Sequence, residues 1–162
     1  MKITQARLKE LLHYNPLTGI FTLLIASKRR RVGHTFGPKH PGSYVTIFLD
    51  GKIYKAHHLA WLYTHGRFPK VMLDHENRDK GDNAIKNLRE ATAQQNACNK
   101  RYRRKDNTTG FRGVSPSGKR WVAACTANGK AYHLGSYATP EEASAAYEKR
   151  SAELHGEFKY KR

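Results

Sequence analysis

The sequence has few cysteines and no long apolar run. Its only two cysteines, Cys98 and Cys125, form no Cys-x-x-Cys pair, which excludes a four-cysteine zinc site and gives no disulfide framework. No apolar run approaches the ~18 residues that span a membrane, and no signal peptide is recognisable. We therefore expect a reduced intracellular compartment and neither secretion nor membrane insertion.

Acidic residues are also scarce, with 13 Asp and Glu against 30 Lys and Arg and a formal net charge of +17. Such a chain is drawn to polyanions, and phosphate neutralisation with counterion release makes nucleic acid the leading partner. An anionic membrane surface is the alternative. It would require a basic amphipathic helix or a lipid anchor, and the sequence contains neither.

The spacing of apolar and turn residues predicts helices and short strands along the whole chain, hence an α+β protein. Thr4 is a candidate N-cap for a helix that Asn15-Pro16 ends, and Asp50-Gly51 is the favoured pair for a hairpin turn. We expect the remaining elements of the first part in this order: a strand at 19–26, a basic loop at 26–42, the hairpin at 43–56, a helix at 57–66 and a strand at 70–73.

The last third has its own apolar pattern. Thr92 and Gln95 form a capping box that starts a helix, and a basic polar linker covers 99–109. Three short strands follow between 110 and 137. A last helix has Thr139 as N-cap and ends at Gly156. The predicted divisions are a first domain at 1–98, the linker, and a second domain at 110–162.

The stretch from Asp74 to Asn96 holds three Asp, four Asn, two Glu and one His. Hydrolysis of a phosphodiester needs an oxygen-ligated cation and an activated water. Asp74 and Asn96 offer oxygen ligands of the kind that Mg²⁺ prefers, and His75 can take a proton from water near neutral pH. Neighbouring residues of a regular strand point to opposite faces, so a shared site requires the strand to end or bend at Leu73–Asp74. The alternative without a catalytic role is a polar loop whose Asp and Asn residues only form turns.

This stretch, "DHENRDKGDNAIKNLREATAQQN", resembles the core of the phage and intron-encoded HNH endonucleases, and the resemblance extends over roughly residues 7–97. It implies a ββα-metal nuclease core, preceded by a helix and a DNA-contacting β-ribbon. By position, Asp74 and Asn96 would bind the divalent cation, Mg²⁺ or alternatively Mn²⁺. His75 would be the general base, oriented by Asn87 through hydrogen bonds within the loop.

Other histidines and one arginine depart from that family or have plainer roles. Arg78 stands where the family often has Gly, and His58 where it usually has Arg. We expect neither to touch the catalytic residues. His57 is expected to be a structural hydrogen-bonding residue at the start of a helix.

The segment 110–156 resembles the DNA-binding domain of plant ethylene-response factors (APETALA-two-like), through "RGV", "GKRWVA" and "LGSY". The resemblance implies a three-stranded antiparallel sheet packed on one helix, with the sheet in the DNA major groove. Ser115, Thr126 and His133 depart from the family, so its target sequence does not carry over. The residues expected on the DNA-facing sheet are Arg112, Lys119, Arg120 and Trp121, although Trp121 could equally be a core residue.

Two basic runs lie near the expected nuclease core, and each is either a solvated face or a set of phosphate contacts. We favour phosphate contacts for both runs, which comprise Arg29, Arg30 and Arg31 in the first and Arg101, Arg103 and Arg104 in the second.

The sequence therefore predicts a metal-dependent DNA endonuclease of the homing type in a bacterial or phage-infected cytoplasm. With one active site per chain it would nick double-stranded DNA as a monomer, without a small-molecule substrate. The alternative is a non-catalytic, sequence-specific DNA-binding regulator built on an HNH-like core. An RNA-binding protein is a weaker alternative, because the aromatic ring-stacking motifs of RNA modules are missing.

Overall fold

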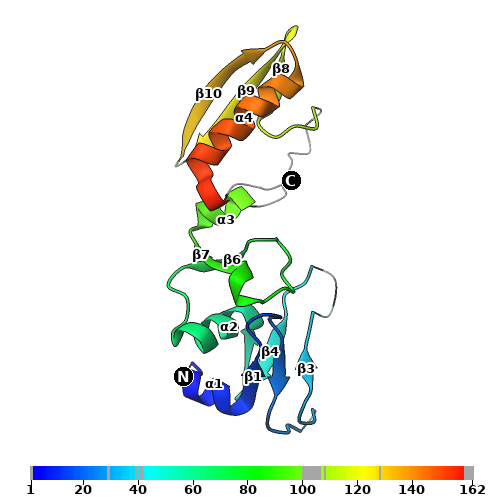
Figure 1. The fold of residues 1–162 in the computed structure, drawn as a ribbon, viewed down its shortest axis with the longest axis vertical. Coiled ribbons are helices and arrows are strands. Elements are labelled where there is room, and N and C mark those ends of the chain that lie inside the picture. The colour runs from blue at the N-terminus through cyan, green and yellow to red at the C-terminus, as the bar shows by residue number, and fades with distance from the viewer. Residues whose placement is uncertain are drawn as a thin grey trace. The chain divides into compact units, whose positions relative to one another are not determined.

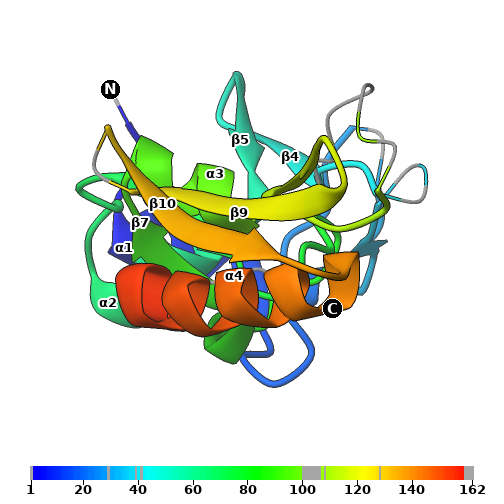
Figure 2. The same cartoon turned by 90° about the horizontal axis from the view of Figure 1, so that it is seen from above.

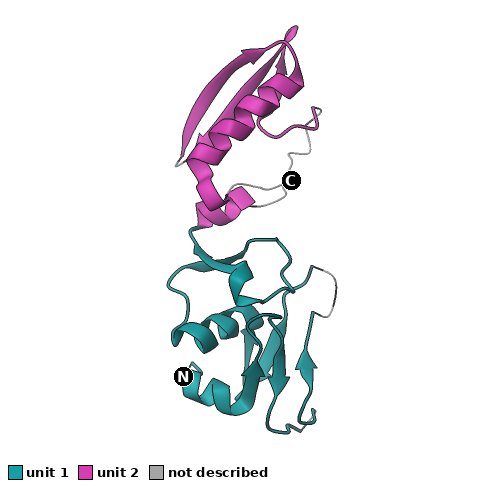
Figure 3. Cartoon of the chain, viewed as in Figure 1, with its two compact units in different colours: residues 1–92 teal, residues 93–162 magenta. Residues whose placement is uncertain are grey.

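The computed structural model describes residues 2–28, 30–38, 40, 42–99, 107, 109–127 and 129–158. Arg29, Arg101, Arg103 and Arg104 lie outside them, as does most of the expected linker. The chain divides into two compact units, residues 1–92 and 93–162, called here the N-terminal and the C-terminal unit (Figure 3). The elements form small antiparallel sheets and helices (Figure 1), which confirms the predicted α+β class.

The N-terminal unit begins with a capped helix. The Thr4 side chain accepts a hydrogen bond from the Arg7 amide, as expected of an N-cap. The helix ends at Leu11, earlier than the predicted stop at Asn15-Pro16, because the next three residues pair with Phe21–Leu23 as a strand. The elements of this unit are α1 (Gln5–Leu11), β1 (Leu12–Tyr14), β2 (Phe21–Leu23), β3 (Thr35–Phe36), β4 (Thr46–Leu49), β5 (Lys52–Lys55), α2 (Ala56–His65), β6 (Met72–His75), the short 3-10 helix η1 (Ile85–Asn87) and β7 (Leu88–Ala91).

The β4–β5 hairpin and α2 follow the sequence prediction. Asp50 and Gly51 have φ angles of 45° and 79°, the left-handed pair that a type I′ turn requires. Gly66 ends α2 in the left-handed conformation, and its amide donates to the Leu62 carbonyl. One apolar core joins α1, α2 and the three sheets β1-β2-β3, β4-β5 and β6-β7, and its fully buried members include Leu8, Phe21, Ile47 and Leu59.

The C-terminal unit contains a three-stranded antiparallel sheet covered on one face by a helix (Figure 2). Thr139 and Glu142 make the predicted capping box at the start of that helix, and Gly156 follows its last residue. The small side chains of Ala123 and Ala143 are fully buried, which lets helix and sheet approach closely. The elements are α3 (Ala93–Asn99), β8 (Val114–Ser117), β9 (Arg120–Ala127), β10 (Lys130–Tyr137), α4 (Pro140–His155) and the short 3-10 helix η2 (Gly156–Phe158).

Across the described residues, no helix is long and apolar enough to cross a bilayer.

Candidate active site

The polar stretch forms a two-stranded ribbon. β6 and β7 pair antiparallel, with Asp74 opposite Arg89 and His75 opposite Leu88. The strand therefore continues through both residues to His75, two residues beyond the predicted end at Leu73. The reason is that each residue has a partner on β7, which keeps the ladder going to His75. Since side chains alternate along a strand, any site shared by Asp74 and His75 has to lie around the end of β6.

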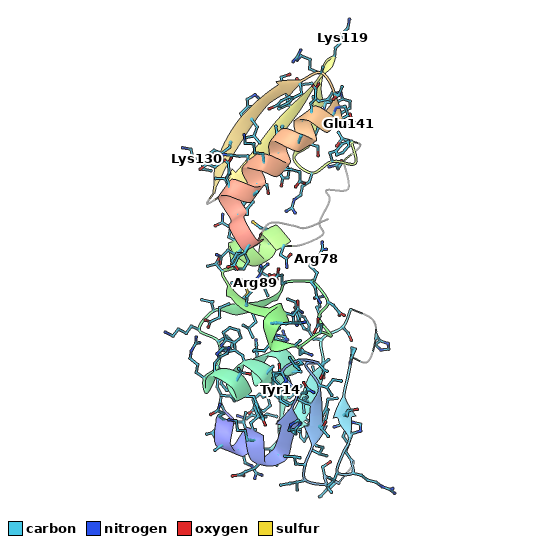
Figure 4. The ribbon with its side chains drawn as sticks, in the orientation of Figure 1. Tyr14, Arg78, Arg89, Lys119, Lys130 and Glu141 are labelled. Carbon is cyan, nitrogen blue, oxygen red and sulfur yellow. The ribbon has the colours of Figure 1, made fainter. Side chains whose placement is uncertain are left out.

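Asp74 is buried in an ion pair with its partner across the ribbon. The Nε and Nη2 atoms of Arg89 donate to Asp74 Oδ2 at 3.0 and 2.9 Å, and only 6% of the Asp74 side chain is exposed. Figure 4 labels Arg89 on β7. This pair holds the carboxylate in one orientation. It is a feature that the sequence analysis did not anticipate, although the Asn-Leu-Arg motif contains the arginine.

Removal of this arginine should be costly. Arg89→Ala leaves a buried carboxylate without its cation, so we expect the free energy of unfolding of the N-terminal unit to fall by about 3 kcal/mol. The measurement is urea unfolding followed by the fluorescence of Trp61, in a Trp121→Phe background that removes the other tryptophan.

The matched control is an arginine that pairs with the same ribbon from outside it. Arg67 pairs with Glu90 of β7 at 2.9 Å, but the Arg67 side chain is 44% exposed, so Arg67→Ala should cost no more than about 1 kcal/mol. Equal losses in the two variants would show that the burial of the Asp74–Arg89 pair is unimportant.

His75 lies at the end of β6 and is buried, with 5% of its surface exposed. Its Nε2 atom is 3.5 Å from Asn83 Oδ1. The ring packs edge-on against His57 at 5.0 Å between centroids and lies 6.0 Å from Tyr44. Burial lowers the pKa of His75, against the opposing effects of Asn83 and of Asp74. The neutral ring, which can accept a proton, is thereby favoured near pH 7.

His57 is part of this site, which the sequence analysis missed. It opens α2 next to β5, and its ring contacts those of His75 and His58. The expected role as a hydrogen-bonding residue does not hold for its Nδ1 atom, which is buried and has no hydrogen-bond partner among the described residues. Burial, together with the positive charges that His58 and His75 can carry, lowers the pKa of His57 to about 3. The adjacent histidines His57 and His58, which precede "LAW", are the sequence feature from which a place in this site could have been predicted.

This low pKa predicts a loss of stability in acid. Between pH 6.5 and pH 3 the unfolded chain binds a proton at His57 more readily than the folded chain does, so stability falls as pH falls through that range. From pH 7.5 to pH 5, His57 alone should remove about 2 kcal/mol from the free energy of unfolding. We expect His57→Phe to flatten the pH dependence by that amount in urea unfolding, whereas His13→Phe, at an exposed position, should leave it unchanged. A His57→Phe profile as steep as that of the unmodified protein would contradict the assignment.

Asn87 braces the loop between the two ribbon strands. Its Oδ1 accepts from the Asn77 amide and its Nδ2 donates to the Asp82 carbonyl, both at 2.9 Å. These bonds lie within the loop, as the family resemblance implies. The orientation of His75 by Asn87 stays a prediction, and it is Asn83 whose Oδ1 atom lies 3.5 Å from the His75 ring.

Basic and aromatic side chains of the N-terminal unit are in contact with one another. The Nζ atoms of Lys55 and Lys80 lie 4.6 and 5.1 Å from the centre of the Tyr44 ring. Of the first predicted basic run, the Arg30 guanidinium lies 5.0 Å from the Phe36 ring and Arg31 is exposed. Because the Tyr44 ring lies 6.0 Å from the His75 ring, Lys55 and Lys80 are basic side chains close to His75.

Asn96, the second proposed metal ligand, lies in α3 and so belongs to the C-terminal unit. Within that unit α3 is tied to the sheet and to α4. The Sγ atoms of Cys98 and Cys125 lie 3.3 and 3.6 Å from the two ring nitrogens of His155. Arg112 also reaches α3, since its Nη1 donates to the Cys98 carbonyl at 3.2 Å. The helix that carries Asn96 is thus anchored by C-terminal side chains.

The predicted DNA-facing residues of the C-terminal unit divide into two groups. Trp121 packs against the core cluster of Ala123 and Cys125, which supports the alternative that it is a core residue. Arg112 is engaged with α3, so it is not simply an outward base-reading side chain. Lys119 is exposed at the β8–β9 turn (Figure 4). Arg120 is also exposed, although its guanidinium donates to Ser136.

Residues 54–98 match the protein-family model described as HNH endonuclease. That segment runs from β5 through both strands of the ribbon into α3, and it contains Asp74, His75, Asn87 and Asn96. An uncharacterized HNH endonuclease of Acanthamoeba polyphaga mimivirus is 32% identical over 116 residues, which is 71% of this chain. The chain spans 60% of the length of that relative. No solved structure matches the chain. The family match and the relative together support a nuclease enzyme.

Proposed function

We propose that the chain is a metal-dependent HNH DNA endonuclease of the homing type, which hydrolyses a phosphodiester and nicks double-stranded DNA as a monomer. The observation that carries this proposal is the buried His75, with its depressed pKa and its polar and aromatic neighbours, inside the segment that matches the HNH family. A neutral imidazole held at one end of a ribbon is suited to removing a proton from an attacking water.

The residues at the ribbon fit a hard divalent cation. Among the described residues, no group of three or more His, Cys, Asp and Glu side chains is placed to hold a metal, which argues against a closed zinc-type site. Mg²⁺ requires fewer protein ligands, since one or two protein oxygens together with waters and substrate phosphates complete its coordination shell. Asp74 is the ribbon residue that would hold it, and Asn96 of α3 is the second ligand that the family resemblance implies. A carboxylate offers about four lone-pair positions, so the bonds from Arg89 to Oδ2 do not prevent ligation.

The chemistry then divides between the cation and the side chains. A bound Mg²⁺ or Mn²⁺ would offset the negative charge that builds on the phosphate and on the leaving oxygen. His75 accepts the proton of the water, and Arg89 keeps the Asp74 carboxylate oriented. Lys55, Lys80 and the proposed phosphate-binding arginines hold the DNA backbone, which positions the duplex without reading its sequence. Lys119 and Arg120 are proposed to extend this contact on the C-terminal unit.

A plasmid assay tests the proposal. Supercoiled plasmid incubated with the full chain at low salt should be converted to the nicked form in Mg²⁺ or Mn²⁺, and should stay supercoiled in EDTA. Robust cleavage in EDTA would overturn the metal assignment. DNA binding without cleavage under every metal condition would favour the alternative, a non-catalytic DNA-binding regulator.

A further inference from the structure

The loop between β6 and β7 contains a second buried asparagine beside the catalytic histidine. Asn83 is only 2% exposed, and its Oδ1 atom faces His75 Nε2 at 3.5 Å. It lies four residues before Asn87, the residue to which the family resemblance gives the orienting role. The two asparagines have different partners, since those of Asn87 are backbone atoms of the loop.

The direction of the Asn83 amide is fixed by its other partner. Its Nδ2 atom donates to the Gly81 carbonyl at 3.0 Å. A carbonyl oxygen cannot donate, so the amide nitrogen has to face Gly81 and the amide oxygen has to face His75. An amide oxygen only accepts, which means that the facing nitrogen of a neutral His75 ring has to carry the hydrogen.

The backbone of Asn83 is held by residues from the start of the chain. The Tyr14 hydroxyl donates to the Asn83 carbonyl at 2.7 Å, across 69 positions of sequence. Burial raises the pKa of Tyr14, so this donor keeps its proton. The Ile85 amide donates to the Pro16 carbonyl at 3.0 Å. Gly19 approaches so closely that a Cβ there would lie 2.3 Å from the Asn83 carbonyl carbon. Asn83 therefore has little freedom to move away from His75.

We propose that Asn83 is a positioning residue that fixes His75 as the tautomer with hydrogen on Nε2, so that Nδ1 is the nitrogen that takes the proton from water. Asn87 then stabilises the loop, and Asn83 fixes the tautomer of the His75 ring. The catalytic part rests on the proposed nuclease function, whereas the tautomer is a property of the protein alone. The 3.5 Å separation is long for a ground-state hydrogen bond, and such bonds shorten when substrate is bound.

The tautomer is measured directly by long-range proton–nitrogen NMR on the full chain labelled with ¹⁵N-histidine. His75 is assigned by the signal that disappears in His75→Gln. In the unmodified protein at pH 8 the His75 pattern should be that of hydrogen on Nε2. A pattern of hydrogen on Nδ1 overturns the proposal without any substitution at Asn83, and does so whether or not the protein cleaves DNA.

Substitutions then separate positioning from general stability. Asn83→Ala should give a mixture of the two His75 tautomers and lower kcat by about 10–100-fold, with KM for plasmid DNA changed little. Asn83→Asp keeps an oxygen that can face His75 Nε2 and should retain the tautomer, although it loses the donor to the Gly81 carbonyl.

The control is Asn77→Ala, at an exposed loop asparagine whose side chain bonds to Asp82; it should leave the His75 tautomer unchanged. An Asn83→Ala protein with the original tautomer and full kcat would overturn the proposal. Failure of the unmodified protein to cleave any DNA, with the Nε2 tautomer present, would count against the nuclease function and not against the role of Asn83 in setting the ring.

Discussion

His75→Ala should lower the rate of DNA cleavage by about 10²–10⁴-fold, the usual cost of removing a general base. The variant loses the proposed general base but keeps the cations around Tyr44 and the whole C-terminal unit, so its affinity for DNA should be unchanged. The measurement is single-turnover cleavage of plasmid in Mg²⁺, together with binding measured in Ca²⁺ or EDTA.

Two further variants make this result interpretable. His13→Ala changes an exposed histidine of β1 outside the site and should cleave at the original rate. His75→Gln fills more of the buried volume than alanine does, and it should be equally inactive if the imidazole itself is required. A His75→Ala enzyme of full activity would move the general base to another residue.

Gly19→Ala should destabilise the N-terminal unit by about 4 kcal/mol or more, which is among the largest effects a single methyl group can have. Two costs combine. Gly19 has φ of +72°, a conformation that strains alanine by about 1 kcal/mol. Its Cβ would also lie 2.3 Å from the Ala84 amide nitrogen, and this backbone atom cannot move without displacing Asn83. Urea unfolding followed by Trp61 fluorescence measures the loss.

Gly33→Ala is the matched control, because Gly33 also has a positive φ, of +84°, and a Cβ there would have nothing within 4 Å. It should cost only the ~1 kcal/mol of backbone strain. A loss of the same size in both variants would show that the contact with Asn83 and Ala84 relaxes at no cost.

The elements that the sequence predicted well are those fixed by local chemistry. The Asp50-Gly51 turn, the Thr4 cap and the Thr139 capping box each depend on a few neighbouring residues, and each is present. The backbone conformation of Arg78 is also consistent with a local sequence feature. It stands where the related family often has Gly, and its φ of +68° is in the left-handed region that glycine favours.

The parts of the site that the sequence did not predict depend on contacts between distant segments. His57 is in another helix, Tyr44 precedes another hairpin, and the pairing of Asp74 with Arg89 requires the register of the ribbon. Asn83 was inside the conspicuous stretch. Nothing in the local pattern distinguished it from the three other asparagines there, since its burial comes from Tyr14 and Gly19.

The bond between Tyr14 and Asn83 also has a consequence for the order of events during synthesis. A hydroxyl near the start of the chain cannot meet a carbonyl 69 positions later until the ribosome has released that later segment. Helix α1 and the β4–β5 hairpin contain mainly local contacts and can form earlier. The loop between β6 and β7 is therefore expected to acquire its shape last within the N-terminal unit, so that a nascent chain with most of its fold in place has no ordered His75.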